Sequence, residues 1–348
     1  MPRPPERSFA SDNTAGVSPE VIDALNAVAA GSAMPYGSDD LTALAYQAFD
    51  DLFETNVATL FCWGGTGANV VGLASVLEPW QAVLSPDSAH IVVDECGAPA
   101  RFTGATITPV PTSDGRLRIA DLDPFLQWAH SEHHPQPRVV SVSQATETGQ
   151  LYSVDQLGDI AEFAHSHNML VHVDGARIAN AIAATGASVN EMLVATGVDL
   201  MTFGLTKNGA MYGEAVVFID PSLASNARFV RKQAGQLASK GRYIAAQALA
   251  LLQDDLWLTN AAHANALATT LAEQVSSISG IDIHGRPEVN AVFAQLPRSV
   301  IDDLQRWSFF WDWDTNENLV RWMTSFETTE ADVERFVAGL RHFMSIQR

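Results

Sequence analysis

The sequence contains few cysteines and few basic residues, and both shortages narrow the classes of protein that it can encode. Two cysteines, Cys62 and Cys96, are too few for a disulfide framework in a chain of 348 residues. Twenty lysines and arginines stand against forty aspartates and glutamates, which gives a net charge of −20. Phosphate backbones and anionic lipids repel such a chain, so we expect no nucleic-acid or membrane partner.

The sequence also lacks a long apolar run. No stretch reaches the roughly 18 apolar residues that a membrane helix needs. The first seven residues are rich in proline and arginine and do not have the apolar core of a secretory signal. Hydrophobic residues nevertheless make up 47% of the chain, enough for a large core. We therefore expect a soluble, folded protein of the cytoplasm.

Short apolar runs alternate with helix-like segments between residues 60 and 220. This alternation is typical of a parallel sheet that is buried on both faces. It predicts an α/β fold whose ligands lie at the carboxyl ends of the strands. The expected strands cover residues 58–62, 90–93, 107–110, 139–142, 170–173, 200–203 and 215–219, and the expected helices cover 68–77, 122–130 and 154–166.

The segments on either side of this block are more helical. Ser18 before Pro19 is typical of an N-cap, and it predicts a helix over 18–30. Residues 228–253 and 258–279 indicate two further helices, and the rest mixes strands and helices. We predict a large domain with an N-terminal arm over residues 1–240 and a small α+β domain over 241–348.

A glycine-rich loop, Gly64-Gly65-Thr66-Gly67-Ala68-Asn69, follows the first expected strand and begins a helix. Its glycines allow close backbone approach, and the free N–H groups at the helix start attract an anion. The spacing matches neither a Walker loop nor a full dinucleotide fingerprint. Phosphate binding and a plain turn are therefore both compatible with this loop.

Two charged residues follow expected strands of the same block. Asp174 ends the strand over 170–173, where a carboxylate can keep a pyridinium nitrogen protonated; the alternative is a cap for the next helix. Lys207 follows the strand over 200–203, where an amine can bind a cofactor covalently; the alternative is an exposed loop lysine. Of the chain's three lysines, the others being Lys232 and Lys240, only Lys207 follows a strand of this block.

A phosphate loop, then an aspartate and then a lysine at strand ends is the order found in the pyridoxal-phosphate fold that includes aspartate aminotransferase. The chain further resembles the L-threonine aldolases of the low-specificity type, over nearly its full length. The matching segments are Ser11-Asp12-Asn13-Thr14, Tyr36-Gly37-Ser38-Asp39, Gly65-Thr66, His90, His172-Val173-Asp174-Gly175-Ala176-Arg177, Thr206-Lys207, Arg231-Lys232-Gln233-Ala234-Gly235 and Val320-Arg321. The segment from His172 to Arg177 is the most specific of them.

The resemblance implies a pyridoxal-phosphate site in the large, mostly parallel domain. Lys207 would bind the cofactor covalently and Asp174 would pair with its ring nitrogen. His90 would stack on the ring, although a histidine in an apolar run can also be a core residue. The remaining implied cofactor ligands are Gly65, Thr66, Arg177 and Thr206.

The resemblance also implies how the substrate is held. Ser11, Arg177 and Arg321 would bind its carboxylate, a task that suits planar guanidinium groups. The chain departs from the family at two places. Lys240 is our candidate for a phosphate-binding arginine of the family, reaching a neighbouring subunit's cofactor, with Arg242 as the alternative. Glu147 stands where many members have a histidine near the substrate hydroxyl, so Glu147, His90 and a water molecule all remain candidates for the general base.

The implied activity is a carbon–carbon lyase that cleaves threonine, allo-threonine or a related β-hydroxy-α-amino acid such as phenylserine to glycine and an aldehyde. Its sites would be shared between subunits of a homotetramer or dimer. An aminotransferase or β-eliminating lyase of the same fold is the main alternative. A regulatory protein without catalysis would not need Lys207 and Asp174. A metal site at His130, His133 and His134, in a proline-flanked loop, is the weakest alternative, and we expect no metal.

Overall fold

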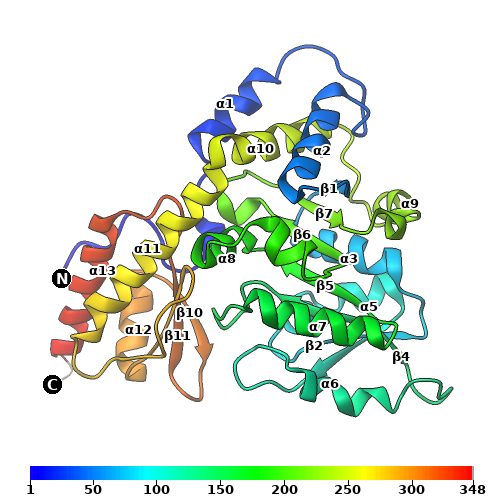
Figure 1. The fold of residues 1–348 in the computed structure, drawn as a ribbon. Helices are drawn as coiled ribbons and strands as arrows, with labels where there is room; N and C mark the ends of the chain where they lie inside the picture. Colours follow the sequence, from blue (N-terminus) through cyan, green and yellow to red (C-terminus); the bar gives the residue numbers. More distant parts are fainter. Residues whose placement is uncertain (347–348) are drawn as a thin grey trace.

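The computed structural model describes residues 1–346, and its centre is a seven-stranded sheet in the order β1-β7-β6-β5-β4-β2-β3 (Figure 1). The strands are β1 (Ala58–Cys62), β2 (Gln81–Pro86), β3 (Thr106–Val110), β4 (Gln136–Ser143), β5 (Leu170–Gly175), β6 (Leu200–Gly204) and β7 (Glu214–Phe218). Strand β7 runs antiparallel to both of its neighbours, β1 and β6, whereas β3, β2, β4, β5 and β6 pair in parallel. The expected α/β fold with a mostly parallel sheet is confirmed.

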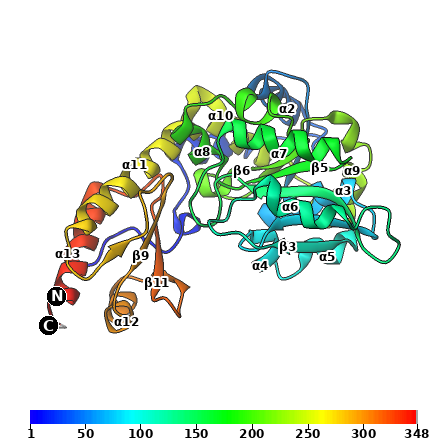
Figure 2. The ribbon, with the colours of Figure 1, turned by 60° about the horizontal axis from the view of Figure 1, so that its bottom comes forward.

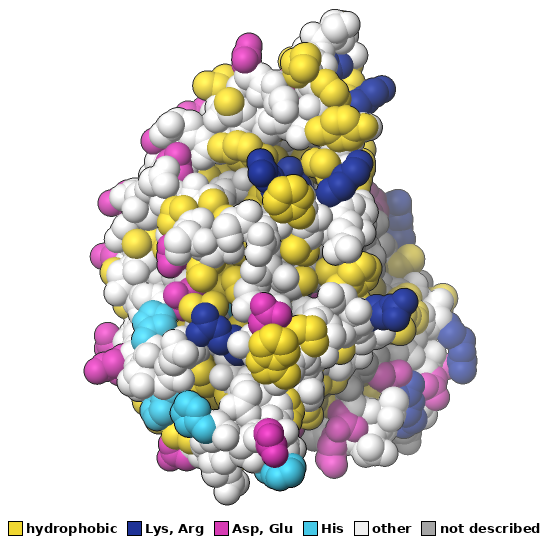
Figure 3. All heavy atoms as spheres, turned by 90° about the vertical axis from the view of Figure 1, so that its right-hand side faces the viewer, with side chains coloured by type: hydrophobic (Ala, Val, Ile, Leu, Met, Phe, Trp, Pro, Cys, Tyr) yellow, Lys and Arg dark blue, Asp and Glu magenta, His cyan; other side chains and the backbone are white. Residues whose placement is uncertain are grey.

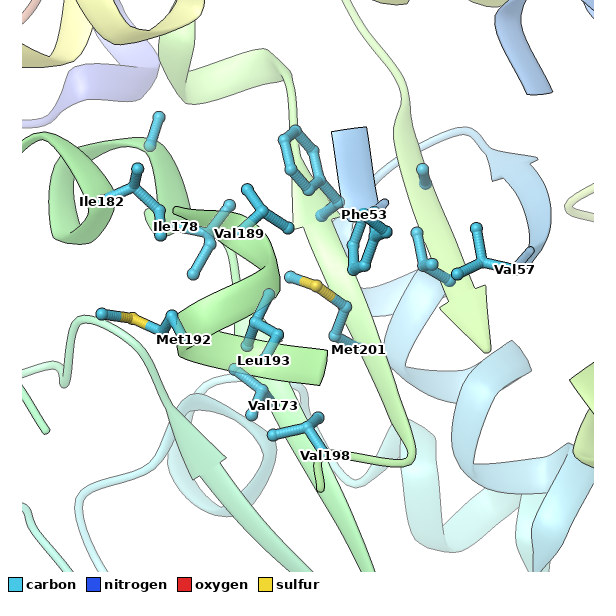
Figure 4. Packing of buried hydrophobic residues seen from close by; sticks show 14 of the residues in the cluster. Phe53, Val57, Val173, Ile178, Ile182, Val189, Met192, Leu193, Val198 and Met201 are labelled. Atoms are coloured by element: carbon cyan, nitrogen blue, oxygen red, sulfur yellow. The ribbon is translucent and has the colours of Figure 1, made fainter. Parts of the chain in front are cut away.

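Helices cover both faces of this sheet because its strands are apolar on both sides. Val216 and Phe218 of β7 pack toward α3 and α9, while Ala215 and Val217 lie in the larger core on the opposite face. Figure 4 shows part of that larger core, where Met201 of β6 packs among residues of neighbouring segments. The helices of this part are α1 (Pro19–Ala27), α2 (Asp40–Phe53), α3 (Gly65–Val76), α4 (His90–Val93), α5 (Ala98–Thr103), α6 (Ile119–Leu126), α7 (Val154–Ser166), α8 (Ile178–Thr185), α9 (Ala227–Gln233) and α10 (Arg242–Leu252).

Two expected elements differ from the structure, and one strand was missed. Residues 90–93 form the short helix α4 and not a strand, because a four-residue apolar run fits either structure and the backbone N–H of His90 is held by the Glu147 carboxylate. Strand β2 was not expected. The expected helix over 228–253 is interrupted between α9 and α10, where Gly235 has a φ of +73°.

A second, antiparallel sheet of four strands, in the order β10-β11-β9-β8, lies beside the large one (Figure 2). Its strands are β8 (Asp282–Ile283), β9 (Ala291–Gln295), β10 (Trp311–Asp314) and β11 (Leu319–Met323), and its helices are α11 (Leu256–Ser276), α12 (Arg298–Trp307) and α13 (Glu330–Ile346). Single helical turns complete the chain at η1 (Asp12–Thr14), η2 (Asn190–Val194), η3 (Thr206–Asn208), η4 (Pro221–Ala224) and η5 (Gln253–Asp255). This second unit has its own apolar core.

Contacts cross residue 240 in both directions. Helix α10 packs against α1 and α2 of the large unit. Phe9 of the N-terminal arm lies in the core of the small unit, with its ring stacked 4.5 Å from that of Phe336. The division of the chain at residue 240 therefore stays a prediction. Within residues 1–346, none of the helices is long and apolar enough to cross a membrane.

Candidate active site

A pocket lies beyond the carboxyl ends of β4, β5 and β6, where the small unit's β10–β11 hairpin faces the large sheet. It has a volume of about 760 Å³ including its open mouth. Nine of the residues proposed from the sequence line it, namely Ser11, Gly65, Thr66, His90, Glu147, Asp174, Arg177, Lys207 and Arg321. Thr206 and Lys240 lie outside this lining.

The N-terminus of α3 forms one end of the pocket. A Cβ added at Gly64 or Gly65 would meet nothing within 4 Å, so the space beside this backbone is open. The N–H groups of the first helical turn have no partner within the helix and point outward. A Cβ at Gly67, by contrast, would overlap the amide end of the Gln236 side chain, so that flexible side chain would have to move for a larger residue. This end of the pocket can bind a phosphate through backbone N–H groups.

Lys207 lies in the η3 turn directly after β6. The turn is held by two hydrogen bonds, in which Thr206 Oγ1 donates to the carbonyl of Gly213 at 3.2 Å and the N–H of Leu205 donates to the Glu214 carboxyl. Burial, followed by the charge of Arg177, lowers the pKa of Lys207. A larger neutral fraction makes the amine a better nucleophile. Thr206 therefore supports the turn that carries Lys207, and the surroundings of Lys207 make its amine more reactive.

Glu214 supports this turn from β7, and burial raises its pKa to about 7. A carboxyl whose pKa is higher in the folded than in the unfolded protein contributes its full stabilisation of the fold below its unfolded pKa, here 4.5. That contribution is lost as pH rises through the pKa of the folded protein. Between pH 4.5 and pH 8, we expect the free energy of unfolding of wild type to fall by about 1–3 kcal/mol relative to that of E214Q, which lacks the ionisable group. Urea unfolding at both pH values measures this shift.

The control for this prediction is E191Q. Glu191 is exposed, and hydrogen bonds from Ser188 lower its pKa, so its replacement should not favour the variant at high pH. Equal shifts in E214Q and E191Q would contradict the role given to burial.

Asp174 ends β5 with its side chain buried. Its carboxylate accepts hydrogen bonds from Asn69 Nδ2 at 2.7 Å and from the N–H of Ala176 at 3.0 Å. Burial alone would raise its pKa, but the bond from Asn69 and the charge of Lys207 lower it. His172 in the same strand is buried, which lowers its pKa to about 4 and keeps it neutral. Asp174 is thus an ionised carboxylate at the pocket floor.

Two arginines form the opposite wall. Arg177 donates from Nε and Nη2 to the Asp12 carboxylate at 2.7 and 2.9 Å. Burial would raise the pKa of Asp12, but Arg177 brings it to about 2. Burial and the nearby charge of Arg177 lower the pKa of Arg321 to about 10. Arg321 lies 5.0 Å from the ring centre of Trp313, and its buried Nε has no hydrogen-bond partner among residues 1–346. This wall is suited to an anionic ligand.

Glu147 lies between the two ends of the pocket. Its Oε1 accepts hydrogen bonds from the His90 N–H at 2.9 Å and from Ser143 Oγ at 2.7 Å. Its Oε2 is buried and, within the described part of the chain, has no hydrogen-bond partner. Burial raises the pKa of this carboxyl. One oxygen is thus fixed and the other is free to take a proton.

The sequence did not reveal several of these residues. Asn69 ends the glycine-rich loop, and we predicted no role for it from the sequence. Its spacing from Gly65 and Thr66 could have indicated that the three residues share one face of α3. Asp12, Glu95 and Trp313 gave no local signal of the contacts that they make. No cluster of His, Cys, Asp and Glu in residues 1–346 is placed to hold a metal ion.

Comparison with known proteins decides the family. A sequence model described as "Beta-eliminating lyase" matches residues 8–298. This chain belongs to that family. It is 37% identical to a low-specificity L-threonine aldolase of a Pseudomonas species over 342 residues, covering 97% of this chain and 98% of the relative. It is 39% identical to one of Pseudomonas aeruginosa over 332 residues, covering 94% of each.

Solved structures agree. A structure of Leishmania major threonine aldolase matches with a TM-score of 0.90 at 30% identity and covers 97% of this chain and 99% of that one. A putative L-allo-threonine aldolase from Listeria monocytogenes shares the fold, with a TM-score of 0.73 at 17% identity and coverage of 93% and 92%. Members of this β-eliminating lyase and threonine aldolase family depend on pyridoxal phosphate. The open α3 N-terminus, the partly buried Lys207 and the ionised Asp174 fit that cofactor.

Proposed function

We propose that this protein cleaves L-threonine, L-allo-threonine and related β-hydroxy-α-amino acids to glycine and an aldehyde. The observation that carries this function is one pocket that combines a partly buried lysine, a buried ionised aspartate and a pair of arginines. The relatives that are 37–39% identical over nearly the whole chain are low-specificity L-threonine aldolases, which supports the same reaction.

Each group of pocket residues has a separate proposed role. Lys207 would hold pyridoxal phosphate covalently, with its phosphate at Gly65 and Thr66. Bound pyridoxal phosphate draws electron density from the substrate's α carbon into its ring. Asp174 keeps the ring nitrogen protonated, because its own pKa is low. Ser11, Arg177 and Arg321 bind the substrate carboxylate and so orient the bond to be broken.

Glu147 is our proposed general base for the β-hydroxyl proton. Its free Oε2 lacks a partner, it lines the pocket, and its raised pKa makes it a better proton acceptor than an exposed carboxylate. His90 and a water molecule are the competing candidates, which replacement of each residue would separate.

The variant E147Q is expected to lower kcat/KM by about 10²-fold. Because the ionised carboxylate is the active form, wild-type kcat/KM should rise with pH through the raised pKa of Glu147, and the variant should lose that rise. S143A is the companion variant, since losing the hydroxyl that donates to Glu147 should move the rise to higher pH. A full rate with an unchanged pH profile in E147Q would assign the base to another group.

We further propose that the active form is a homo-oligomer, a dimer or tetramer, in the cytoplasm. Figure 3 shows a face on which hydrophobic side chains are interleaved with lysines and arginines. Three large hydrophobic side chains are about half exposed or more: Trp63, which directly precedes the glycine-rich loop, Met211 and Phe229. A second copy covering this region would bring its exposed Lys240 toward the phosphate end of the pocket. Two measurements on wild type and K240A test this arrangement. Light scattering gives the oligomeric state, and titration with pyridoxal phosphate gives the affinity for the cofactor.

The function is tested by a product assay with added pyridoxal phosphate and with threonine, allo-threonine and phenylserine in turn. Glycine together with the matching aldehyde is the expected result, and the rates rank the side chains. Ammonia with an oxo-acid would indicate β-elimination, and amino transfer to an oxo-acid without aldehyde would indicate an aminotransferase. Either outcome would replace the proposed reaction.

A further inference from the structure

Glu95 is a buried carboxylate directly behind His90 and has no part in the chemistry described so far. Its side chain is 0% exposed and that of His90 is 39% exposed, and both residues line the pocket. Glu95 Oε1 lies 3.2 Å from His90 Nδ1. Among residues 1–346, His90 is the one basic side chain that pairs with it. Because an unpaired buried carboxylate is costly, this contact with His90 is a requirement of the site.

A single amide joins Glu95 to the acid at the pocket floor. Asn69 Nδ2 donates to Glu95 Oε1 at 2.9 Å and to Asp174 Oδ2 at 2.7 Å. Thr202 Oγ1 donates to Asn69 Oδ1 at 2.7 Å, which fixes the orientation of the amide. The two carboxylates therefore have one shared donor, and the position of Glu95 is tied to that of Asp174.

We propose that Glu95 is a positioning residue that holds Nδ1 of His90, leaves Nε2 for the pocket, and keeps the imidazole positively charged. This inference rests on the proposed function, because His90 lines the same pocket as Lys207 and Asp174. The hydrogen bond that Glu95 accepts from His90 Nδ1 is the largest cause of the raised pKa of His90, and burial opposes it. Asp174 also raises this pKa and Lys207 lowers it, while Glu147 contacts the backbone N–H of His90.

Hydrogen–deuterium exchange at the imidazole C2 position, followed by peptide mass spectrometry, measures the titration of His90 in the holoenzyme. In wild type we expect His90 to titrate above the ordinary histidine value of 6.5, and in E95Q we expect it to titrate at lower pH than in wild type. The variant should also lower kcat by about tenfold, with a smaller change in KM, as loss of an outer partner does. The control D87N removes a carboxylate near α4 that bonds Thr112 and not His90, so His90 should titrate as in wild type.

A double-mutant comparison separates positioning from a general structural effect. If Glu95 acts through His90, E95Q should cause no further loss of kcat in an H90N background. A full additional loss there, or an unchanged His90 titration in E95Q, would overturn the proposal. If E95Q does not fold, E95D keeps the charge, and His90 in E95D should titrate between its wild-type position and the ordinary histidine value of 6.5. A wild-type His90 that titrates no higher than 6.5 refutes the proposal without any variant. The titration does not depend on the reaction, so its failure is distinct from failure of the aldolase assay.

Discussion

Replacing Lys207 by alanine is expected to lower aldol cleavage by at least about 10⁴-fold, the scale of loss when a covalent catalyst is removed. Lys207 lies in the η3 turn and lines the same pocket as Asp174. Burial and Arg177 lower its pKa, so a fraction of the amine is neutral and reactive near neutral pH. Neither Lys232 nor Lys240 lines this pocket, so neither can replace it within one chain.

Borohydride reduction followed by mass spectrometry checks the covalent role directly. Wild type should gain the mass of the reduced cofactor on the peptide that contains Lys207, and K207A should gain none. The variant K207R keeps the positive charge but cannot make the same bond, so it should be as inactive as K207A. Activity in K207R within tenfold of wild type would mean that Lys207 contributes charge only.

Local sequence patterns were sufficient to place Asp174 and Lys207 at the carboxyl ends of neighbouring strands. Asp174 and Lys207 each follow an apolar run that forms a strand, and the carboxyl ends of parallel strands meet at one edge of a sheet. The helix α7 (Val154–Ser166) was predicted with the same bounds, and in the structure Ser153 and Gln156 form a capping box at its start.

Contacts between distant segments could not be predicted in this way. The ion pair that orients Arg177 is one example: its Nε and Nη2 donate to Asp12, 165 positions away in the chain. The partners of Asn69 lie 26, 105 and 133 positions away. Local periodicity carries no information about such pairs, because they depend on how the sheet and the small unit come together.

Replacing Asp174 by asparagine is expected to lower kcat by about 10³-fold while leaving the fold intact, because the amide has the same size but no charge. The carboxylate accepts bonds from Asn69 and Ala176, and its lowered pKa keeps it ionised. For a group with a lowered pKa, the active ionised form is lost only as pH falls through that value. Asp174 should therefore cause no change in wild-type activity with pH near neutrality, and the D174N defect should be equally large at pH 6 and pH 9.

The phosphate end of the pocket does not involve Asp174, so D174N should still bind pyridoxal phosphate, with an altered absorption spectrum because the ring nitrogen loses its charged partner. D332N is the matched control: Asp332 is also buried, but it accepts bonds from Glu6 and Thr329, and it does not line the pocket. Its loss should lower the free energy of unfolding by about 1–3 kcal/mol and leave kcat unchanged. If D174N and D332N reduced kcat equally, the effect of Asp174 would be one of stability, and the ring-nitrogen role would have to be given to another residue.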